Sequence, residues 1–457
     1  MGWMNDQPCL IVRCVATLTA FERLNSAQRS AAQFGAREED GTFRAGPLLI
    51  IAGAGTGRTN TLAHRVAHLI LEGVSPERIL LLTFTRRAAQ EMTRRTQRIV
   101  AAVLAEKAGE NTGDVAVKLP WSGTFHSIAN RLIRHHAARV GLDANFSVLD
   151  RGDAADLMDL LRHERALSKT DKRFPRKDTC LAIYSHRVNT QAPLGHTLAK
   201  VFPWCADWEE ELTRLYRAYV ERKLANQALD YDDLLLYWQA MAADPALAAE
   251  MGGQFDHILV DEYQDIGADQ YELISALAGR TLEDAERKLS LFAVGDDDQN
   301  IYAFAGASVE YIRRFQTDYA SKPVFLTENY RSTQNIVAAA NAVIAPARER
   351  MKADRPIAIN RARAKSAPGG EWQDRDPVGA GKVQVLPAGS SLVGQALAVM
   401  TELERQSKLA ADWSWSRAAV IAREWKYLDP VRAYCEVHGI AAQMADDVPP
   451  SIWRLRE

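Results

Sequence analysis

Short apolar runs alternate along this chain with longer segments whose apolar residues recur at helical spacing. The runs lie at 48–51, 79–83, 258–260, 291–294 and 324–326. After the first run, Leu62, Val66 and Leu69 are spaced three or four residues apart, as on one face of a helix. Buried strands that alternate with helices predict a parallel sheet covered by helices on both faces, so the expected fold class is α/β.

The alternation of strands and helices stops between about residues 142 and 228. Trp, Leu, Arg and Glu recur there at helical spacing, which predicts a helical insertion. A connector rich in Gly, Pro and charge follows at 366–382. Beyond it we expect a strand at 383–386, a helix around 392–406, a strand at 418–422 and a helix after Tyr427. This pattern predicts the beginning of a second α/β unit.

The composition is that of an ordinary globular protein. A chain of 457 residues predicts two to four domains. The formal net charge of −2 does not indicate a nucleic-acid binder, so any such binding must use local basic surface. One candidate is an arginine cluster that contains only one acid, Glu91, and consists of Arg86, Arg87, Arg94, Arg95 and Arg98. A solvated helix face explains this cluster equally well.

The cysteines argue against a metal centre and for a reducing compartment. They lie far apart, without a CxxC pair or a histidine at ligand spacing, at Cys9, Cys14, Cys180, Cys205 and Cys435. The apolar stretch at 9–18 is interrupted by Arg13, is too short to span a bilayer and lacks a signal-peptide cleavage pattern. We therefore expect a cytoplasmic protein.

A glycine-rich turn between the first apolar run and the following helix predicts a phosphate-binding loop. It consists of Ala52, Gly53, Ala54, Gly55, Thr56, Gly57, Arg58 and Thr59. Backbone N–H groups and the positive end of the helix bind phosphates in such a loop, and Thr59 is expected to bind Mg²⁺. A glycine-rich connector is the alternative, and it fits the strand–loop–helix context poorly.

Two positions depart from the general pattern of phosphate-binding loops. Ala52 replaces its first glycine, which is a mild change. Arg58 replaces its lysine, and a planar guanidinium cannot occupy the point between the outer phosphates that a compact ammonium occupies. We expect nucleotide binding to survive and hydrolysis to fall, because the charge of the transition state is poorly met.

Two further strand ends carry polar residues suited to phosphate chemistry. The strand at 258–260 ends in Asp261, expected to hold Mg²⁺, and in Glu262, expected to orient and deprotonate the attacking water. The strand at 291–294 is followed by Gln299, a polar probe of the terminal phosphate. Three such strand ends in this order make coincidence a poor explanation.

Together these segments resemble superfamily 1 DNA helicases of the UvrD/Rep type. The segments are AGAGTGRT (52–59), TFTRRAAQEM (83–92), GTFHS (123–127), LDYDDLL (229–235), VDEYQD (260–265), VGDDDQNIYAFAGA (294–307) and ENYRST (328–333). The segment LNSAQRSAA (24–32) is similar to the adenine-reading Q motif of that family. The resemblance is strong over about 24–344 and weak beyond.

The resemblance implies roles on two faces. On the nucleotide face, Gln28 would hydrogen-bond adenine, Tyr330 would stack on it, and Arg331 would reach the terminal phosphate. Gln299 would couple the nucleotide state to the DNA groove. On the DNA face, stacking or backbone contacts with a single strand would come from Phe84, Thr85, Arg86, His126, Tyr302 and Phe304.

The resemblance also implies a domain plan and an activity. ATP and Mg²⁺ would drive 3′-to-5′ movement along single-stranded DNA and separation of the duplex ahead. The chain would divide into an N-terminal extension (1–19), a first RecA-like domain (20–140 and 229–318), a helical inserted subdomain (141–228) and a partial second RecA-like domain (319–457).

The chain departs from the family in ways that favour weak activity. Ala305 replaces an arginine beside the stacking aromatic, and nothing after residue 366 resembles the later motifs. We therefore expect a truncated or attenuated helicase. The alternative is a nucleotide-gated DNA-binding module that hydrolyses little ATP. A helicase–nuclease subunit is disfavoured, because no nuclease carboxylate cluster is visible outside the motor segments.

Overall fold

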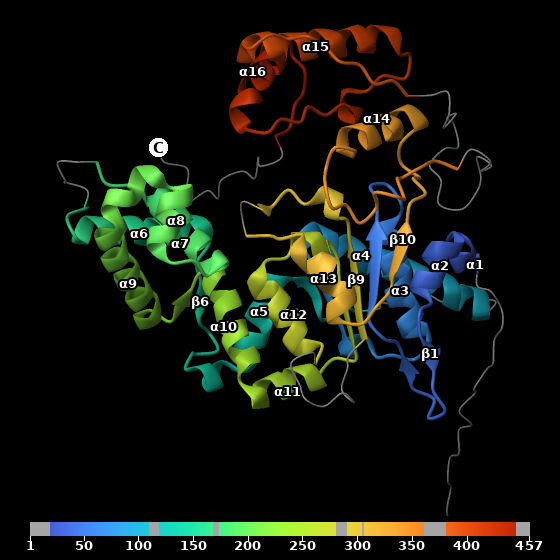
Figure 1. The fold of residues 1–457 in the computed structure, drawn as a ribbon, viewed down its shortest axis with the longest axis horizontal. Helices are drawn as coiled ribbons and strands as arrows, with labels where there is room; N and C mark the ends of the chain where they lie inside the picture. The colour runs from blue at the N-terminus through green and yellow to red at the C-terminus, as the bar shows by residue number, and fades with distance from the viewer. Residues whose placement is uncertain are drawn as a thin grey trace, which may run out of the picture. The chain divides into compact units, whose positions relative to one another are not determined.

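Six parallel strands form the central sheet of the computed structural model, in the spatial order β10-β3-β9-β8-β4-β5 (Figure 1). Their bounds are β3 (Leu48–Ala52), β4 (Ile79–Thr83), β5 (Ser122–Thr124), β8 (His257–Val260), β9 (Ser290–Gly295) and β10 (Pro323–Leu326). The α/β class with a parallel sheet is confirmed. Every apolar run predicted as a strand in this sheet is a strand, whereas β5, with the sequence Ser-Gly-Thr, has no apolar run and escaped prediction.

The chain divides into two compact units, residues 1–381 and 382–457. The structure describes residues 19–108, 118–167, 173–279, 290–303, 306–360 and 381–444. Residues 1–18 of the expected N-terminal extension, which include Cys9 and Cys14, lie outside these residues. So does most of the 366–382 connector. Within the described part, no helix is long and apolar enough to cross a membrane.

Helices cover both faces of the sheet because its strand residues alternate between two cores. Leu49 and Ile51 of β3 face one core, while Leu48 and Ile50 face the other. The first core is closed by α5 (Phe125–His135), α10 (Tyr231–Ala243), α11 (Pro245–Gly253), α12 (Ala268–Leu277) and α13 (Glu310–Asp318). The second core is closed by α2 (Ser26–Ala32), α3 (Arg58–Leu71) and α4 (Arg86–Ala108).

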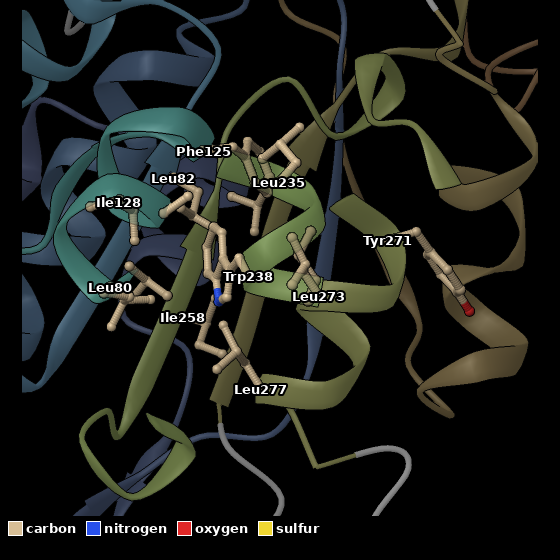
Figure 2. Packing of buried hydrophobic residues seen from close by; sticks show 14 of the residues in the cluster. Leu80, Leu82, Phe125, Ile128, Leu235, Trp238, Ile258, Tyr271, Leu273 and Leu277 are labelled. Carbon is tan, nitrogen blue, oxygen red and sulfur yellow. The ribbon is translucent and has the colours of Figure 1, made fainter. Parts of the chain in front are cut away.

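The larger core is organised around Trp238 of α10. Its indole is fully buried and lies among side chains from the sheet, including Leu82 and Ile258, and from α12, including Leu273 (Figure 2). The ring of Phe125 on α5 lies 6.4 Å from it. This packing fixes the helices that follow the strand ends, and thereby the loops that carry the candidate site.

Smaller elements complete the first unit. They are α1 (Thr19–Glu22), a hairpin of β1 (Ala36–Arg37) and β2 (Phe43–Arg44), α14 (Gln334–Ile344), and the 3₁₀ turns η1 (Pro76–Arg78), η2 (Ala137–Val140), η5 (Tyr263–Asp265) and η7 (Asp297–Gln299).

Residues 141–228, expected to be a helical insertion, form a helical group with its own core. The group contains α6 (Arg151–Glu164), α7 (Lys177–Thr190), α8 (Leu194–Val201), η4 (Pro203–Trp208) and α9 (Glu209–Ala225) (Figure 1). At its base, β6 (Ser147–Val148) pairs in parallel with β7 (Ala228–Leu229). The entering and leaving chain segments are thus joined side by side.

A buried lysine joins this helical group to α10. Lys223 of α9 is 2% exposed, and its Nζ lies 2.6 Å from a carboxylate oxygen of Asp230 and 2.6 Å from one of Asp233. Asp232, next to them, accepts hydrogen bonds from Ser185 and Asn189 of α7. The LDYDDLL segment therefore anchors α7 and α9 to the helix that carries Trp238.

Beyond residue 318, where the second RecA-like domain is expected to start, the chain first adds a strand to the central sheet. β10 pairs in parallel with β3 and so completes the first sheet. In the second unit, α15 (Leu392–Leu409) and α16 (Asp429–Val437) form as expected, together with η9 (Trp415–Arg417) and η10 (Trp425–Tyr427).

The predicted strands at 383–386 and 418–422 were wrong: neither forms a strand. Val385 is 91% exposed and Ile421 is 92% exposed, and no neighbouring strand within the described residues pairs with either segment. Without a ladder partner or apolar burial, an apolar sequence is not sufficient to make a strand.

We predict that Lys223→Met lowers the free energy of unfolding by about 3–5 kcal/mol, because the carboxylates of Asp230 and Asp233 lose their buried counter-charge. Denaturant unfolding at neutral pH measures the change. Lys200→Met on the exposed surface of α8 is the matched control and should leave stability nearly unchanged. Equal stability of the two variants would contradict the anchoring role.

Candidate functional site

The glycine-rich loop lies between β3 and α3, at the carboxyl end of the sheet. Gly55 (φ 72°) and Gly57 (φ 82°) adopt left-handed backbone conformations that favour glycine. Ala52, at the place of the pattern's first glycine, is the fully buried last residue of β3, where alanine fits without strain. Thr56 stabilises the bend, since its hydroxyl donates to the carbonyl of Gly53 over 2.8 Å.

The ENYRST segment packs directly on this loop. Asn329 donates from Nδ2 to the carbonyl of Ala54 (2.6 Å), and the backbone N–H of Tyr330 donates to the carbonyl of Gly55 (2.8 Å). A Cβ atom on Gly55 would lie 2.6 Å from the Asn329 amide and 2.9 Å from Cβ of Arg331. Gly55 is therefore required for this close approach as well as for its own conformation.

Arg58 makes direct contact with the acid pair at the end of β8. Its Nη2 donates to Oε1 of Glu262, and its Nε lies 3.4 Å from Oδ1 of Asp261. Glu262 has a left-handed backbone (φ 54°), a strained conformation for a non-glycine residue that the surrounding contacts must hold in place. The acids thus lie beside the phosphate loop, as the sequence predicted, but they are already bonded to a residue of that loop.

The Arg58 guanidinium is itself only partly satisfied. Its Nη1 is buried and has no hydrogen-bond partner among the described residues. Burial raises the pKa of Asp261 above its ordinary value, although the positive charge of Arg58 opposes this shift. A buried donor without an acceptor is costly, so the site is incomplete and suited to an anion such as a phosphate.

These contacts bear on the expected magnesium site. Carboxylate and hydroxyl oxygens such as those of Asp261 and Thr59 are suitable ligands for Mg²⁺. In this structure, however, Nε of Arg58 lies 3.4 Å from Oδ1 of Asp261, so a positive charge is already beside this carboxylate. A magnesium ion on Asp261 would be repelled by this guanidinium, so the residues in this arrangement fit such an ion poorly.

A chain of hydrogen bonds links Glu262 to Gln299. Gln264 donates from Nε2 to Oε2 of Glu262 (2.7 Å) and accepts at Oε1 from the backbone N–H of Asp296 (3.0 Å). The Asp296 carboxylate then accepts from Nε2 of Gln299 (2.7 Å). The acid pair and the predicted phosphate sensor are therefore connected through two side chains that sequence reasoning did not single out.

The other side of Asp296 is held by a later segment of the chain. Lys352, which is 2% exposed, forms an ion pair with Asp296 and lies 3.0 Å from a carboxylate oxygen of Asp298. Arg350 bonds both oxygens of Asp298 over 2.8 Å. No sequence pattern predicts these contacts, because isolated basic residues after a helix are common on surfaces.

The structure brings several of the predicted nucleotide residues to one cavity of about 150 Å³. Its lining residues are Gly53, Ala54, Gly55, Gly57, Arg58, Thr59, Asn60, Arg95, Gln299 and Arg331. The sequence indicates Arg95 only as a member of the basic cluster. Its place in the lining of this cavity makes it a candidate phosphate ligand. Helical periodicity cannot tell an arginine that lines this cavity from one that faces solvent on the same helix.

The residues expected to read adenine lie next to the loop. Gln28 is 2% exposed, and its Nε2 donates to the carbonyl of Thr56 (2.8 Å). Asn25 caps the same helix and donates to the hydroxyl of Tyr330 (2.6 Å). Gln28 and Tyr330 thus lie beside the loop although they are far apart in the sequence. Asn25 contacts both of them, accepting from the N–H of Gln28 and donating to the hydroxyl of Tyr330, and no sequence pattern predicts this.

The predicted DNA-contacting residues lie after β4, at the start of α5 and after η7. The rings of Phe84 and Tyr302 pack with centroids 4.9 Å apart. Thr85 caps α4 by accepting from the N–H of Ala88, and Arg86 is exposed in the first turn. Phe304, predicted to stack, and Ala305 lie outside the described residues.

Tyr231, which contacts His126, is a further aromatic candidate for a DNA contact. The ring of His126 lies edge-on to the ring of Tyr231, 5.8 Å away, and Tyr231 is 39% exposed. Burial lowers the pKa of His126, and the charge of Arg86 lowers it further, so the imidazole is neutral at neutral pH. The position of Tyr231 within the LDYDDLL segment is the only sequence feature that could have indicated this residue.

Comparison with known proteins gives a consistent result. A family model described as the UvrD/REP helicase N-terminal domain matches residues 36–320. The chain is 39% identical over 303 residues to a Mycobacterium bovis protein named ATP-dependent DNA helicase UvrD1, covering 65% of this chain and 37% of that protein. It is 38% identical over 312 residues to the Leuconostoc citreum ATP-dependent DNA helicase PcrA, covering 67% and 38%. The chain thus spans little more than a third of these relatives.

We predict that Asn329→Ala weakens binding of a nucleoside triphosphate by about tenfold, or about 1.4 kcal/mol, because the phosphate loop loses part of its support. The variant loses the bond to Ala54 and the acceptor for the N–H groups of Arg331 and Ser332. Titration with a fluorescent ATP analogue measures the affinity. Asn335→Ala, which removes only an exposed bond to Gly381, is the control and should bind normally.

Proposed function

Because the chain belongs to the UvrD/REP helicase family, we propose that it is the ATP-binding part of an ATP-dependent DNA helicase that moves 3′-to-5′ along single-stranded DNA. The observation that carries the proposal is the meeting of the phosphate loop, the acid pair and Gln299 at the carboxyl ends of neighbouring strands. Ligands of open α/β sheets bind at this edge.

Nucleotide binding follows from the groups that surround the loop. The cavity collects positive charge from Arg58, Arg95 and Arg331, which suits a triphosphate. Gln28 and Tyr330 lie where the base would extend from the loop. Nε2 of Gln28 carries two N–H donors, of which the bond to the carbonyl of Thr56 uses one, so adenine would accept from the other.

Coupling to DNA would pass through the segment after β9. Gln299 lines the cavity, and Tyr302 follows it by three residues and packs on Phe84. A phosphate that attracts Gln299 would break its bond to Asp296 and shift this short segment. The aromatic pair would then present a different surface to stacked bases, without reading their sequence. Junctions of single- and double-stranded DNA in the cytoplasm are the proposed substrates.

One observation favours a second candidate, a nucleotide-gated DNA-binding module with little hydrolysis. Both carboxylate oxygens of Glu262 are engaged, one by Arg58 and the other by Gln264. A general base must have an oxygen available for the proton of the attacking water. A water at Glu262 must therefore compete with Arg58 and Gln264 for the remaining lone pairs of the carboxylate, which disfavours hydrolysis.

Steady-state ATPase assays with and without single-stranded DNA distinguish the two candidates. DNA-stimulated turnover that is lost in Glu262→Gln supports the helicase motor. ATP-dependent DNA affinity without turnover supports the binding module. If ATP neither turns over nor changes DNA affinity, both proposals are wrong.

We predict that Phe84→Ala and Tyr302→Ala each reduce the affinity for single-stranded DNA by about 1–3 kcal/mol, the range of one base–aromatic stack. The loss should be similar for different base sequences, because stacking carries little sequence preference. Fluorescence anisotropy with homopolymeric oligonucleotides measures it. Trp204→Ala, at an exposed aromatic of the helical insertion, is the control, and a loss as large as that of Phe84→Ala would contradict the assignment.

A further inference from the structure

We infer that Arg58 replaces the magnesium ion of this site, so that the chain binds a nucleoside triphosphate without a divalent cation. The inference rests on the proposed nucleotide binding and concerns the charge that holds the phosphates. Its basis is that one guanidinium both compensates the acid pair and keeps a free donor.

The geometry of arginine allows this double role. A guanidinium carries five N–H donors in a rigid planar fork. In Arg58 one side of the fork is used, by Nη2 on Glu262 and by Nε close to Asp261. Nη1 remains without an acceptor among the described residues, although it is buried. A phosphate oxygen is the acceptor that would complete the arrangement.

The charges lead to the same conclusion. In phosphate-loop enzymes a metal ion compensates the repulsion between an acidic residue and the triphosphate. Here Arg58 lies between the acid pair and the cavity of the phosphate loop, and because it is attached to the chain its positive charge is always present. A lysine at this position has a single compact charge, which cannot bond two carboxylates and a phosphate in one plane.

A magnesium ion on Asp261 would lie beside the like charge of the Arg58 guanidinium, whose Nε is 3.4 Å from Oδ1 of Asp261. The Asp261 side chain is 5% exposed and that of Arg58 15%, so a displaced guanidinium would lose a buried partner. Glu262 is held in place from its other side by Gln264, which is 1% exposed. Binding of magnesium to Asp261 is therefore opposed by contacts that exist before the nucleotide arrives.

The test is the affinity for a fluorescent, non-hydrolysable ATP analogue in magnesium and in EDTA. For the unmodified chain we expect the two dissociation constants to agree within about threefold, whereas in Arg58→Lys removal of magnesium should weaken binding by about tenfold or more. Arg214→Lys, at an exposed arginine of α9, is the matched control and should behave like the unmodified chain. Thermal unfolding confirms that each variant is folded.

The outcomes separate this inference from the proposed function. Binding by the unmodified chain only in magnesium overturns the inference and leaves nucleotide binding intact. Binding by Arg58→Lys but not by the unmodified chain also overturns it, since Arg58 would then block the site. If neither protein binds the analogue under either condition, the inference and the proposed nucleotide site are both wrong.

Discussion

The compensation of two neighbouring carboxylates at a buried strand end is the constraint on which this site depends. Asp261 is 4% exposed and lies directly beside Glu262, so their charges cannot be left to solvent. Arg58 supplies the positive charge from the phosphate loop, 204 residues away in sequence. Because the loop provides this charge itself, we infer that a bound nucleotide needs no metal ion to compensate the acid pair, unlike in a loop with lysine.

The rest of the first unit keeps this compensation in place. Parallel pairing of β3, β9 and β8 brings the loop, Asp296 and the acids to one edge of the sheet. Gln264 and Asp296 extend the contacts from Glu262 to Gln299, while Lys352 fixes Asp296 from behind. Asn329 stabilises the loop by donating a hydrogen bond to the carbonyl of Ala54. A change at any of these positions is expected to reach the acid pair through hydrogen bonds.

Local pattern was sufficient to predict the parallel sheet and the residues at its strand ends. Apolar runs marked β3, β4, β8, β9 and β10, because strands buried on both faces need such runs. The sequence Ser-Gly-Thr of β5 has no apolar pattern and so does not predict a strand. The segments at 383–386 and 418–422 have a strand-like pattern, but no strand among the described residues pairs with them. The contacts of Arg58, Asn329 and Lys352 join distant parts of the chain, and spacing along a sequence carries no information about such partners.

The most direct test of this account is a crystal structure of the chain with a non-hydrolysable ATP analogue and Mn²⁺, with anomalous scattering used to locate the metal. The account predicts the guanidinium of Arg58 between the Asp261 and Glu262 carboxylates and a phosphate oxygen, with no anomalous peak at Asp261. A manganese peak coordinated by Asp261 and the phosphates, with Arg58 turned away from both acids, would contradict it.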